Sequence, residues 1–462
     1  MSFEKINNVY FLGIGGIGMS ALARYFKAQG KIVSGYDKTP TTLTDELIAE
    51  GISVHFIDSI AVAQLQTSNL KDTTLVIYTP AVPKDLIELN YFLSNGFDVK
   101  KRSEVLGMIT ENHYTIAVAG THGKTTTSSM IAHILKHSGT DCTAFLGGIA
   151  KNYDSNFLLG KGKKSIVVVE ADEYDRSFLT LHPDVAVITS MDADHLDIYG
   201  DSGQLVDSYR SFAKQLKKGG MLFYKSGLQL EDLELGKSTY SLTATADYSP
   251  KNLRIENHRY HFDFKNTEDT IKDISSQLAG AHNVENALAA IAVAKHIGIP
   301  KNKIKEALET YTGVKRRFDY QVQPPTSNVV YIDDYAHHPE ELRACISSAR
   351  ELYPGKKITG IFQPHLFSRT RDFAEGFGRS LSLLDELILL DIYPAREKPI
   401  AGVNSGMLLK DVTIKNKMPC RKEDVLEELE KRNIEVLLTL GAGDIDTLVV
   451  PIRHYLMKKY AN

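Results

Sequence analysis

The sequence predicts an α/β protein of three domains, each built around a parallel sheet. Two glycine-rich turns, Gly13–Gly18 and Gly120–Thr125, each follow an apolar strand and precede a helical pattern. Towards the carboxyl end, apolar strands with polar ends alternate with helices, as in a parallel sheet covered on both faces. A chain of 462 residues also suggests three domains, at about 150 residues each. We expect their boundaries at 1–105, 106–313 and 314–462.

Composition and charge narrow the class of protein. Hydrophobic residues make up 43% of the chain and charged residues 24%, which is ordinary for a soluble globular protein. The net charge of −3 argues against broad binding to nucleic acid or to a membrane surface. The widely spaced Cys142, Cys345 and Cys420 form neither a metal knot nor a disulfide framework. Because no signal segment or long apolar run is found, we expect a cytoplasmic protein.

The first glycine-rich turn has the pattern of a dinucleotide-binding fingerprint. The strand Val9–Ile14 runs into G-x-G-x-x-G and a helix, and a second strand, Lys31–Tyr36, delivers Asp37 about 20 residues past the glycines. Such a turn holds a diphosphate over the helix N-terminus, and the acid can bind a ribose hydroxyl. A further strand, Thr74–Tyr78, ends in Thr79–Pro83 at the edge where ligands bind. Three alternatives stay open: an NAD-dependent oxidoreductase, a site for a UDP-linked sugar, or tight helix–strand packing without a ligand.

The second turn, after the strand Thr115–Val118, predicts a nucleoside triphosphate site. A turn of this kind points backbone N–H groups at phosphates; Lys124 can reach the outer phosphates and the Thr125 hydroxyl can bind the accompanying Mg²⁺. The match to G-x-x-x-x-G-K-[ST] lacks its first glycine, since Val118 stands there. The alternative is a glycine-rich turn with a solvated lysine. As an exposed loop residue, Lys124 is expected to contribute little to stability.

Two later strands of the central domain end in side chains that can bind metal ions. Ser165–Val169 delivers Glu170 and a cluster of four carboxylates, for which a metal site and a solvated acidic turn are both open. Val185–Thr189 is followed by His195, which stands between aspartates. Imidazole is a poor ligand for Mg²⁺, so chemistry alone leaves the role of His195 undecided.

Two motifs near the junction with the third domain can reach a nucleotide. His282 and Asn286 begin a helix after Gly280, where they can contact an adenine edge or cap the helix. Lys315–Phe318 predicts a hinge. Its Arg317 can contact a phosphate, or the three cations form a solvated turn.

The third domain alternates strands with helices. The predicted strands are Val329–Ile332, Lys357–Phe362, Leu387–Leu390 and Val436–Leu440, and the predicted helices Glu340–Leu352 and Asp424–Lys431. We expect a parallel sheet covered on both faces. Because the carboxyl ends of parallel strands meet at one edge, Asp334, His337 and His365 are expected at the edge that faces the chemistry.

Seven segments, taken together, resemble the Mur ligases of bacterial cell-wall synthesis. They are GIGGIGMSALA, AGTHGKTTT, EADEYDRSFL, DADHLD, IDDYAHHPEE, FQPHLFSRTRD and LLTLGAGDI, in the family's order, and they cover essentially the whole chain. The resemblance implies a Rossmann-like N-terminal domain for a UDP-sugar, a central P-loop ATPase-type domain, and a Rossmann-like C-terminal domain that admits an amino acid. It implies an ATP- and Mg²⁺-dependent ligase that joins L-alanine to UDP-N-acetylmuramate through an acyl phosphate.

The resemblance also implies roles for individual residues. The UDP-sugar would be bound by Gly13, Gly15, Gly16, Gly18, Met19, Ser20, Asp37, Thr79 and Ala81. ATP would be bound by Gly120, Thr121, His122, Gly123, Lys124, Thr125, Thr126, His282, Asn286, Arg317, Asp334 and His337. Mg²⁺ would be bound by Thr125, Glu170 and His195, and the amino acid by Tyr335, His365 and Arg369. The catalytic set would be Lys124, Glu170, His195 and His365.

Two positions depart from the family pattern. Leu366 stands where the alanine-adding members often have Arg, which leaves His365 and Arg369 as the polar residues of that segment. Several sibling ligases carry a carbamylated lysine after the metal histidine. Here Arg210 lies at that position and Lys214 is out of register, so we expect no such modification.

Three functions stay open on the sequence. They are the alanine-adding ligase, a ligase that attaches recycled murein tripeptide to the same UDP-sugar, and a nucleotide-binding switch or dehydrogenase. FQPHLFSRT and GAGD favour the first, because they resemble the C-terminal motifs of the alanine-adding members, and the resemblance implies that this domain selects the incoming amine. We expect UDP-N-acetylmuramate and L-alanine as substrates, no nucleic-acid or membrane partner, and a monomer or weak homodimer.

Overall fold

The computed structural model describes residues 3–67, 70–162, 164–192, 199, 201–243, 245–267, 269–324, 326–395 and 397–460. The chain divides into two compact units. The first is Met1–Pro250, Phe264–Ile271 and Asn286–Tyr311, and the second is Lys251–Asp263, Lys272–Glu285 and Thr312–Asn462. The three domain boundaries given above stay a prediction. None of the described helices combines the length and hydropathy that a lipid bilayer requires.

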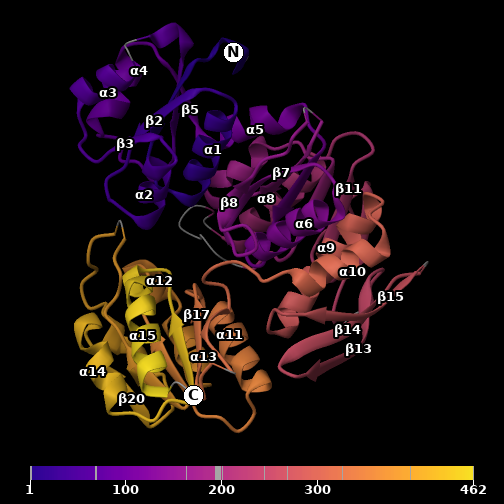
Figure 1. Cartoon of the computed structure of the whole chain (residues 1–462), viewed down its shortest axis with the longest axis vertical. Helices are drawn as coiled ribbons and strands as arrows, with labels where there is room; N and C mark the ends of the chain where they lie inside the picture. The colour runs from indigo at the N-terminus through magenta and orange to yellow at the C-terminus, as the bar shows by residue number, and fades with distance from the viewer. Residues whose placement is uncertain are drawn as a thin grey trace. The chain divides into compact units, whose positions relative to one another are not determined.

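The first unit begins with a five-stranded parallel sheet in the order β3-β2-β1-β4-β5. Its strands are β1 (Asn8–Leu12), β2 (Ile32–Tyr36), β3 (Ser53–His55), β4 (Thr74–Tyr78) and β5 (Asp98–Lys101). Its helices are α1 (Ile17–Ala28), α2 (Thr42–Ala49), α3 (Ile60–Thr67), α4 (Ile87–Ser94) and α5 (Arg102–Glu111). Phe11 shares a buried cluster with Phe26 of α1, whereas its neighbour Tyr10 shares another with Phe92 of α4. Helices therefore cover both faces of this sheet (Figure 1).

The second sheet of the first unit has the order β12-β11-β10-β6-β9-β7-β8. Its strands are β6 (Thr115–Ala119), β7 (Cys142–Ala150), β8 (Ser155–Leu158), β9 (Ile166–Glu170), β10 (Val185–Ile188), β11 (Met221–Lys225) and β12 (Gly236–Tyr240). Neighbours are parallel except β7 and β8 at the edge. The helices are α6 (Lys124–Ser138), α8 (Ser202–Lys214), α9 (Ala281–His296, which belongs to this unit from Asn286 on) and α10 (Lys301–Thr310). Because β6 lies between β10 and β9, the ends of these three strands meet at one edge, where ligands bind in such sheets.

A three-stranded sheet that the motifs did not predict has the order β13-β14-β15. Its strands are β13 (Ser249–Glu256), β14 (Arg259–Lys265) and β15 (Thr270–Ser276). In β14, Tyr260, Phe262 and Phe264 are buried and alternate with less buried residues. This period of two is typical of a strand and is visible in the sequence.

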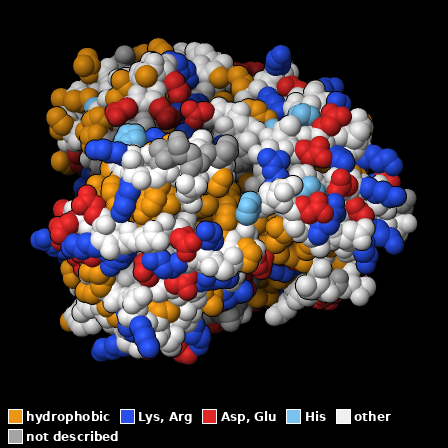
Figure 2. All heavy atoms as spheres, turned by 60° about the horizontal axis from the view of Figure 1, so that its bottom comes forward, with side chains coloured by type: hydrophobic (Ala, Val, Ile, Leu, Met, Phe, Trp, Pro, Cys, Tyr) orange, Lys and Arg blue, Asp and Glu red, His pale blue; other side chains and the backbone are white. Residues whose placement is uncertain are grey.

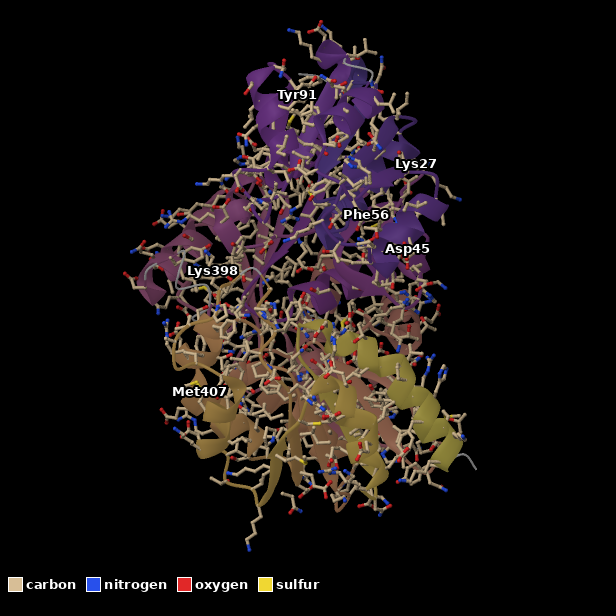
Figure 3. All side chains as sticks on the ribbon, turned by 90° about the vertical axis from the view of Figure 1, so that its left-hand side faces the viewer. Lys27, Asp45, Phe56, Tyr91, Lys398 and Met407 are labelled. Carbon is tan, nitrogen blue, oxygen red and sulfur yellow. The ribbon has the colours of Figure 1, made fainter. Side chains whose placement is uncertain are left out.

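The second unit is built on a sheet in the order β16-β17-β21-β18-β19-β20. Its strands are β16 (Asp319–Val322), β17 (Val330–Asp334), β18 (Ile358–Phe362), β19 (Glu386–Leu389), β20 (Asn416–Pro419) and β21 (Val436–Leu440). Its helices are α11 (Pro339–Leu352), α12 (Phe367–Asp372), α13 (Ala374–Leu381), α14 (Val425–Glu430) and α15 (Val449–Tyr460). Figure 3 shows Lys398 and Met407 in the segment between β19 and β20, with Met407 in the short 3-10 helix Ser405–Lys410.

The four strands predicted for this sheet are parallel to one another, and an edge strand that was not predicted, β16, has the opposite direction. β16 runs antiparallel to β17, whereas the other neighbouring strands are parallel. The connection between β16 and β17 is short, and a parallel pair would need a crossover of a dozen or more residues. Chain length therefore fixes the direction of β16.

Candidate active site

The phosphate loop between β6 and α6 is held by the segment that follows β10. Thr121 Oγ1 donates to the backbone oxygen of Asp192 (2.8 Å), and the His122 N–H donates to Ser190 Oγ (2.8 Å). Thr126, in the first turn of α6, is buried. The segment that follows β10 thus holds the phosphate loop through two hydrogen bonds.

Lys124 is mostly buried and is bound by protein groups. Its Nζ donates to the Gly120 carbonyl (2.6 Å) and to the Glu173 carboxylate (2.9 Å). The expectation of an exposed lysine is wrong, because the side chains of Lys124 and Glu173 are only 13% and 3% exposed. Burial opposes the charge of Lys124, but nearby carboxylates led by Glu173 outweigh it and raise its pKa. Burial also raises the pKa of Glu173 to about 7, against the attraction of the ammonium group.

Thr125 and Glu170, two of the predicted metal ligands, lie together at the end of β9. The Thr125 hydroxyl donates to Glu170 Oε1 (3.1 Å), and the Gly147 N–H donates to Oε2 (3.1 Å). A hydroxyl and a carboxylate are hard oxygen ligands of the kind Mg²⁺ prefers, so the pair fits this ion. The third predicted ligand, His195, lies outside the described residues. Within the described residues, no three His, Cys, Asp or Glu side chains gather into a metal cluster.

Asn286 lies against the phosphate loop. Its Oδ1 accepts a hydrogen bond from Thr127 Oγ1 (3.2 Å). Gly123 has a φ of +83°, which favours glycine, and a Cβ there would lie 2.6 Å from the same Oδ1 and would displace the Asn286 side chain. His282, in the first turn of α9, is exposed. The adenine contacts of Asn286 and His282 stay a prediction.

The first glycine-rich turn uses its own amide groups internally. The N–H of Gly13 donates to Tyr36 O (2.8 Å) and the N–H of Gly16 to Gly13 O (3.2 Å). The Gly15 N–H donates to Asp37 Oδ2 (2.7 Å). One carboxylate oxygen of Asp37 therefore stabilises the turn. This role is additional to the predicted contact with a ribose hydroxyl.

A cavity of about 290 Å³ joins this turn to the end of β9. Its lining includes the predicted sugar-nucleotide residues Gly16, Gly18, Met19, Thr79 and Ala81 together with Glu170 of the metal pair. Ser20, which was also predicted, is buried in α1. Arg102, Phe145 and Leu146 also line the cavity and were not predicted. The three consecutive cations at Lys100–Arg102, which span the end of β5 and the start of α5, are the sequence signal that could have indicated Arg102.

Several predicted residues of the second unit gather at the end of β17. Asp334 accepts hydrogen bonds from the N–H groups of Phe318 (2.6 Å) and Ala336 (2.8 Å). Burial raises the pKa of Asp334 to about 6, although the charge of Arg317 opposes this. The Arg317 guanidinium lies 5.4 Å from the centre of the Tyr335 ring. Asp334, Arg317 and Tyr335 are therefore neighbours.

Two histidines continue this group. The rings of His337 and His365 lie 5.9 Å apart, and His365 stacks on Tyr393 at 5.8 Å. Arg369 is buried in α12. Leu366, which departs from the family pattern, precedes α12 with a φ of +69°. Positive φ in a leucine is strained, and such strain is common at functional sites.

The predicted hinge is also strained and well bonded. Arg316 and Phe318 have φ of +61° and +47°. Arg316 Nε donates to Asp333 (3.1 Å), and its Nη2 donates to the Gly441 carbonyl (2.6 Å). Hinge motion stays a prediction.

Family models match three consecutive stretches of the chain. The Mur ligase family catalytic domain matches residues 8–114, the Mur ligase middle domain residues 118–294, and the Mur ligase glutamate ligase domain residues 316–448. Curated relatives named UDP-N-acetylmuramate–L-alanine ligase match almost end to end. The one from Flavobacterium psychrophilum is 53% identical over 99% of this chain and 100% of its own, and the one from Parabacteroides distasonis is 51% identical over 99% of each.

Solved structures agree. A UDP-N-acetylmuramate–alanine ligase from Thermotoga maritima is 28% identical, with a TM-score of 0.81 over 98% of this chain and 99% of that one. A murein peptide ligase from Psychrobacter arcticus, 22% identical with a TM-score of 0.71 over 97% and 98% of the two chains, shows the fold alone. The ordered motifs, the three family models and the full-length relatives lead to one conclusion. This chain belongs to the Mur ligase family.

Proposed function

We propose that this protein is an ATP-dependent amide ligase that joins L-alanine to the lactoyl carboxylate of UDP-N-acetylmuramate, releasing ADP and phosphate. The cavity of the first unit carries the proposal. Residues of the sugar-nucleotide fingerprint share its lining with Glu170, which is hydrogen-bonded to Thr125 of the phosphate loop. A carboxylate on the bound sugar can therefore come close to the phosphate of ATP. Full-length relatives that carry this activity in their names support the same substrates.

The reaction needs an activated carboxylate, because a free carboxylate does not react with an amine at neutral pH. In the proposed route, the γ-phosphoryl group of ATP moves to the lactoyl carboxylate, the amine of alanine attacks the acyl phosphate, and phosphate leaves. Lys124 and the N-terminus of α6 stabilise negative charge on the transferring group. Thr125 and Glu170, with His195 as a further ligand, would hold Mg²⁺, which supplies neutralisation of phosphate charge when bound.

Residues of the second unit are proposed to serve the amino acid and the nucleotide. Arg369 and Tyr335 bind alanine, and His365 is the candidate to accept the proton from its amine. The residues proposed to contact ATP are Arg317, Asp334 and His337. Water would destroy an acyl phosphate, so the site must close before transfer, and Lys315–Phe318 is the proposed hinge.

A coupled assay for ADP and phosphate tests the function. The purified protein is incubated with ATP, Mg²⁺ and UDP-N-acetylmuramate, together with L-alanine, glycine, L-serine or murein tripeptide in parallel. We expect release that requires both the UDP-sugar and L-alanine. Preference for the tripeptide would show the recycling ligase instead. ATP hydrolysis without either substrate would show a switch.

The role of Arg369 is tested against its neighbour Arg371. Arg371 is 51% exposed and bonds Asp372, so it offers a matched charge removal outside the proposed site. Arg369→Ala should raise the KM for L-alanine about tenfold or more, since a charge-assisted bond to the carboxylate is lost, while the KM for ATP changes little. Arg371→Ala should behave as wild type. An unchanged alanine KM and kcat in Arg369→Ala rejects this role.

The proposed setting is the cytoplasm, with no nucleic-acid or membrane partner, and the chain acting as a monomer or weak homodimer. Basic and acidic side chains are interspersed over the face shown in Figure 2, rather than gathered by sign. Such a surface favours small charged substrates held at local sites over an extended polyanion.

A further inference from the structure

Arg102 brings a positive charge to the cavity beside the first glycine-rich turn. It is the first residue of α5 and the one cationic side chain among the described residues that line this cavity. A Cβ on Gly18 would lie 2.6 Å from Arg102 Nη1, so the guanidinium lies against the first turn of α1. The third glycine of the fingerprint thus makes room for Arg102. Its Nη2 donates to Asp172 Oδ2 (3.2 Å), and its side chain is 20% exposed.

The turn needs help to hold an anion. The N–H groups of Gly13, Gly15 and Gly16 are already hydrogen-bonded within the domain, which leaves the first-turn N–H groups of α1. The other charged side chains around the cavity, Glu170 and Asp172, are carboxylates and repel a diphosphate. Among the side chains of this lining, Arg102 is therefore the one whose charge attracts the diphosphate between uridine and sugar.

We propose that Arg102 binds the diphosphate of the sugar nucleotide and gives up Asp172 to do so. This inference rests on the proposed function, because it takes a UDP-sugar as the ligand. A planar guanidinium can donate two parallel N–H···O bonds to a phosphate, whereas it makes one long bond to Asp172 here. Arg102 is thus a further residue that binds the sugar nucleotide of the proposed reaction. It belongs to α5, which is distant in sequence from the glycine motif.

Calorimetric titration of the full chain with UDP-N-acetylmuramate and with UDP-N-acetylglucosamine, in the absence of ATP, tests this inference. The second ligand has the diphosphate and lacks the lactoyl carboxylate. Arg102→Ala should raise the Kd for both ligands by about ten- to a hundredfold. Arg102→Lys, which keeps the charge without the planar fork, should fall between it and wild type. The Kd for ATP should stay unchanged.

Two further variants separate ligand contact from support of the protein. Lys101 is adjacent to Arg102, donates to Asp175 at 2.9 Å and does not line the cavity. Lys101→Ala therefore removes a comparable ion pair and serves as a matched control. It should leave the Kd values of both UDP-sugars unchanged. Asp172→Asn releases Arg102 from its present partner. It should bind both UDP-sugars as tightly as wild type or more tightly. Melting curves of all variants verify that each one folds.

The outcomes that overturn the inference are distinct. Equal loss in Arg102→Ala and Asp172→Asn would mean that Arg102 only supports the loop that carries Asp172. A loss confined to UDP-N-acetylmuramate would mean that it contacts the carboxylate and not the diphosphate. Wild-type binding in Arg102→Ala would remove Arg102 from the site. If Arg102→Ala does not fold, the Kd values of Arg102→Lys and Lys101→Ala are compared instead, and equal values in the two variants would contradict the inference. Failure of wild type itself to bind UDP-N-acetylmuramate would instead contradict the proposed function.

Discussion

The two glycine-rich turns of the first unit share a backbone plan and differ in where their charge originates. Each follows an inner strand of a parallel sheet and starts a helix, β1 to α1 and β6 to α6. The phosphate loop contains its own cation, Lys124, which Glu173 holds in place. The first turn contains no cation, and Arg102 of α5 brings one to the neighbouring cavity.

This difference corresponds to two tasks. Phosphoryl transfer needs a positive charge at a fixed place beside the helix N-terminus, and a lysine within the loop provides that. A diphosphate that is only bound needs a positive charge within reach, and another helix can provide it. A glycine motif therefore indicates a phosphate near a helix, while side chains elsewhere determine what happens to that phosphate.

The largest expected effect comes from removing the loop cation. Lys124→Ala should lower kcat by about a thousandfold or more, because charge on the transferring phosphoryl group is no longer stabilised. It should also lower the free energy of unfolding by about 2 kcal/mol or more, since Glu173 loses its buried partner. Steady-state kinetics and chemical denaturation measure the two effects. The double variant Lys124→Ala/Glu173→Gln should regain stability without regaining activity; recovery of turnover there would contradict the phosphate role.

A smaller effect is expected from changing Glu170, which with Thr125 forms the predicted Mg²⁺ site. The first glycine-rich turn has no such predicted site. Glu170→Gln should raise the Mg²⁺ concentration for half-maximal activity about tenfold, because a neutral amide oxygen is a weaker ligand than a carboxylate. Binding of UDP-N-acetylmuramate without ATP should be as tight as in wild type or tighter, because a carboxylate that repels the diphosphate is removed. The Mg²⁺ requirement is measured by titrating activity with Mg²⁺. Calorimetric titration with UDP-N-acetylmuramate serves as the control. An unchanged Mg²⁺ requirement would remove Glu170 from the ligand set.

The helices behind the two turns should differ in their response to pH. α6 buries His133, whose pKa burial lowers from 6.5 to about 4 with help from the charge of His137, whereas the buried residues of α1 include no titratable group. Because the folded state disfavours protonated His133, its contribution to stability is complete above pH 6.5 and is lost as the pH falls towards about 4.

The test compares unfolding free energies of wild type and His133→Gln across this range. Glutamine can keep the hydrogen bonds to Tyr153 and Thr310 without titrating. The wild-type free energy should fall by up to about 3 kcal/mol more than that of the variant between pH 6.5 and 4. Parallel curves would show that His133 does not titrate in this window.

The smallest expected effect concerns Asp37. Asp37→Asn should raise the Kd for UDP-N-acetylmuramate only a few-fold, because the amide oxygen can still accept from Gly15 while the charge that favours a ribose hydroxyl is lost. Calorimetry measures the change, and ATP affinity serves as the control. A loss as large as that expected of Arg102→Ala would show that the charge of Asp37, and not its hydrogen bond to Gly15, is what ligand binding mainly requires.

Much of the fold was predictable from local patterns. The strands β4 and β21 begin and end where the apolar runs do, and the helices α11 and α14 lie within one residue of their predicted bounds at each end. Of the predicted site residues, Lys124 and Thr125 at the start of α6 lie beside Glu170 at the end of β9, as their order in the sequence indicated, whereas their roles stay a prediction. The three-stranded sheet β13–β15 was missed although β14 alternates, because no motif drew attention to it.

The local sequence determines whether a segment has the apolar repeat of a helix or of a strand, and which residues form a turn. Both depend on residues only a few positions apart. The local sequence carries no information on which distant side chain meets which. The pairing of Lys124 with Glu173 and the contact of the Arg102 guanidinium with Gly18 each join residues that are far apart in the sequence. Packing created these contacts, because burial forces charged groups to find partners wherever the fold brings them together.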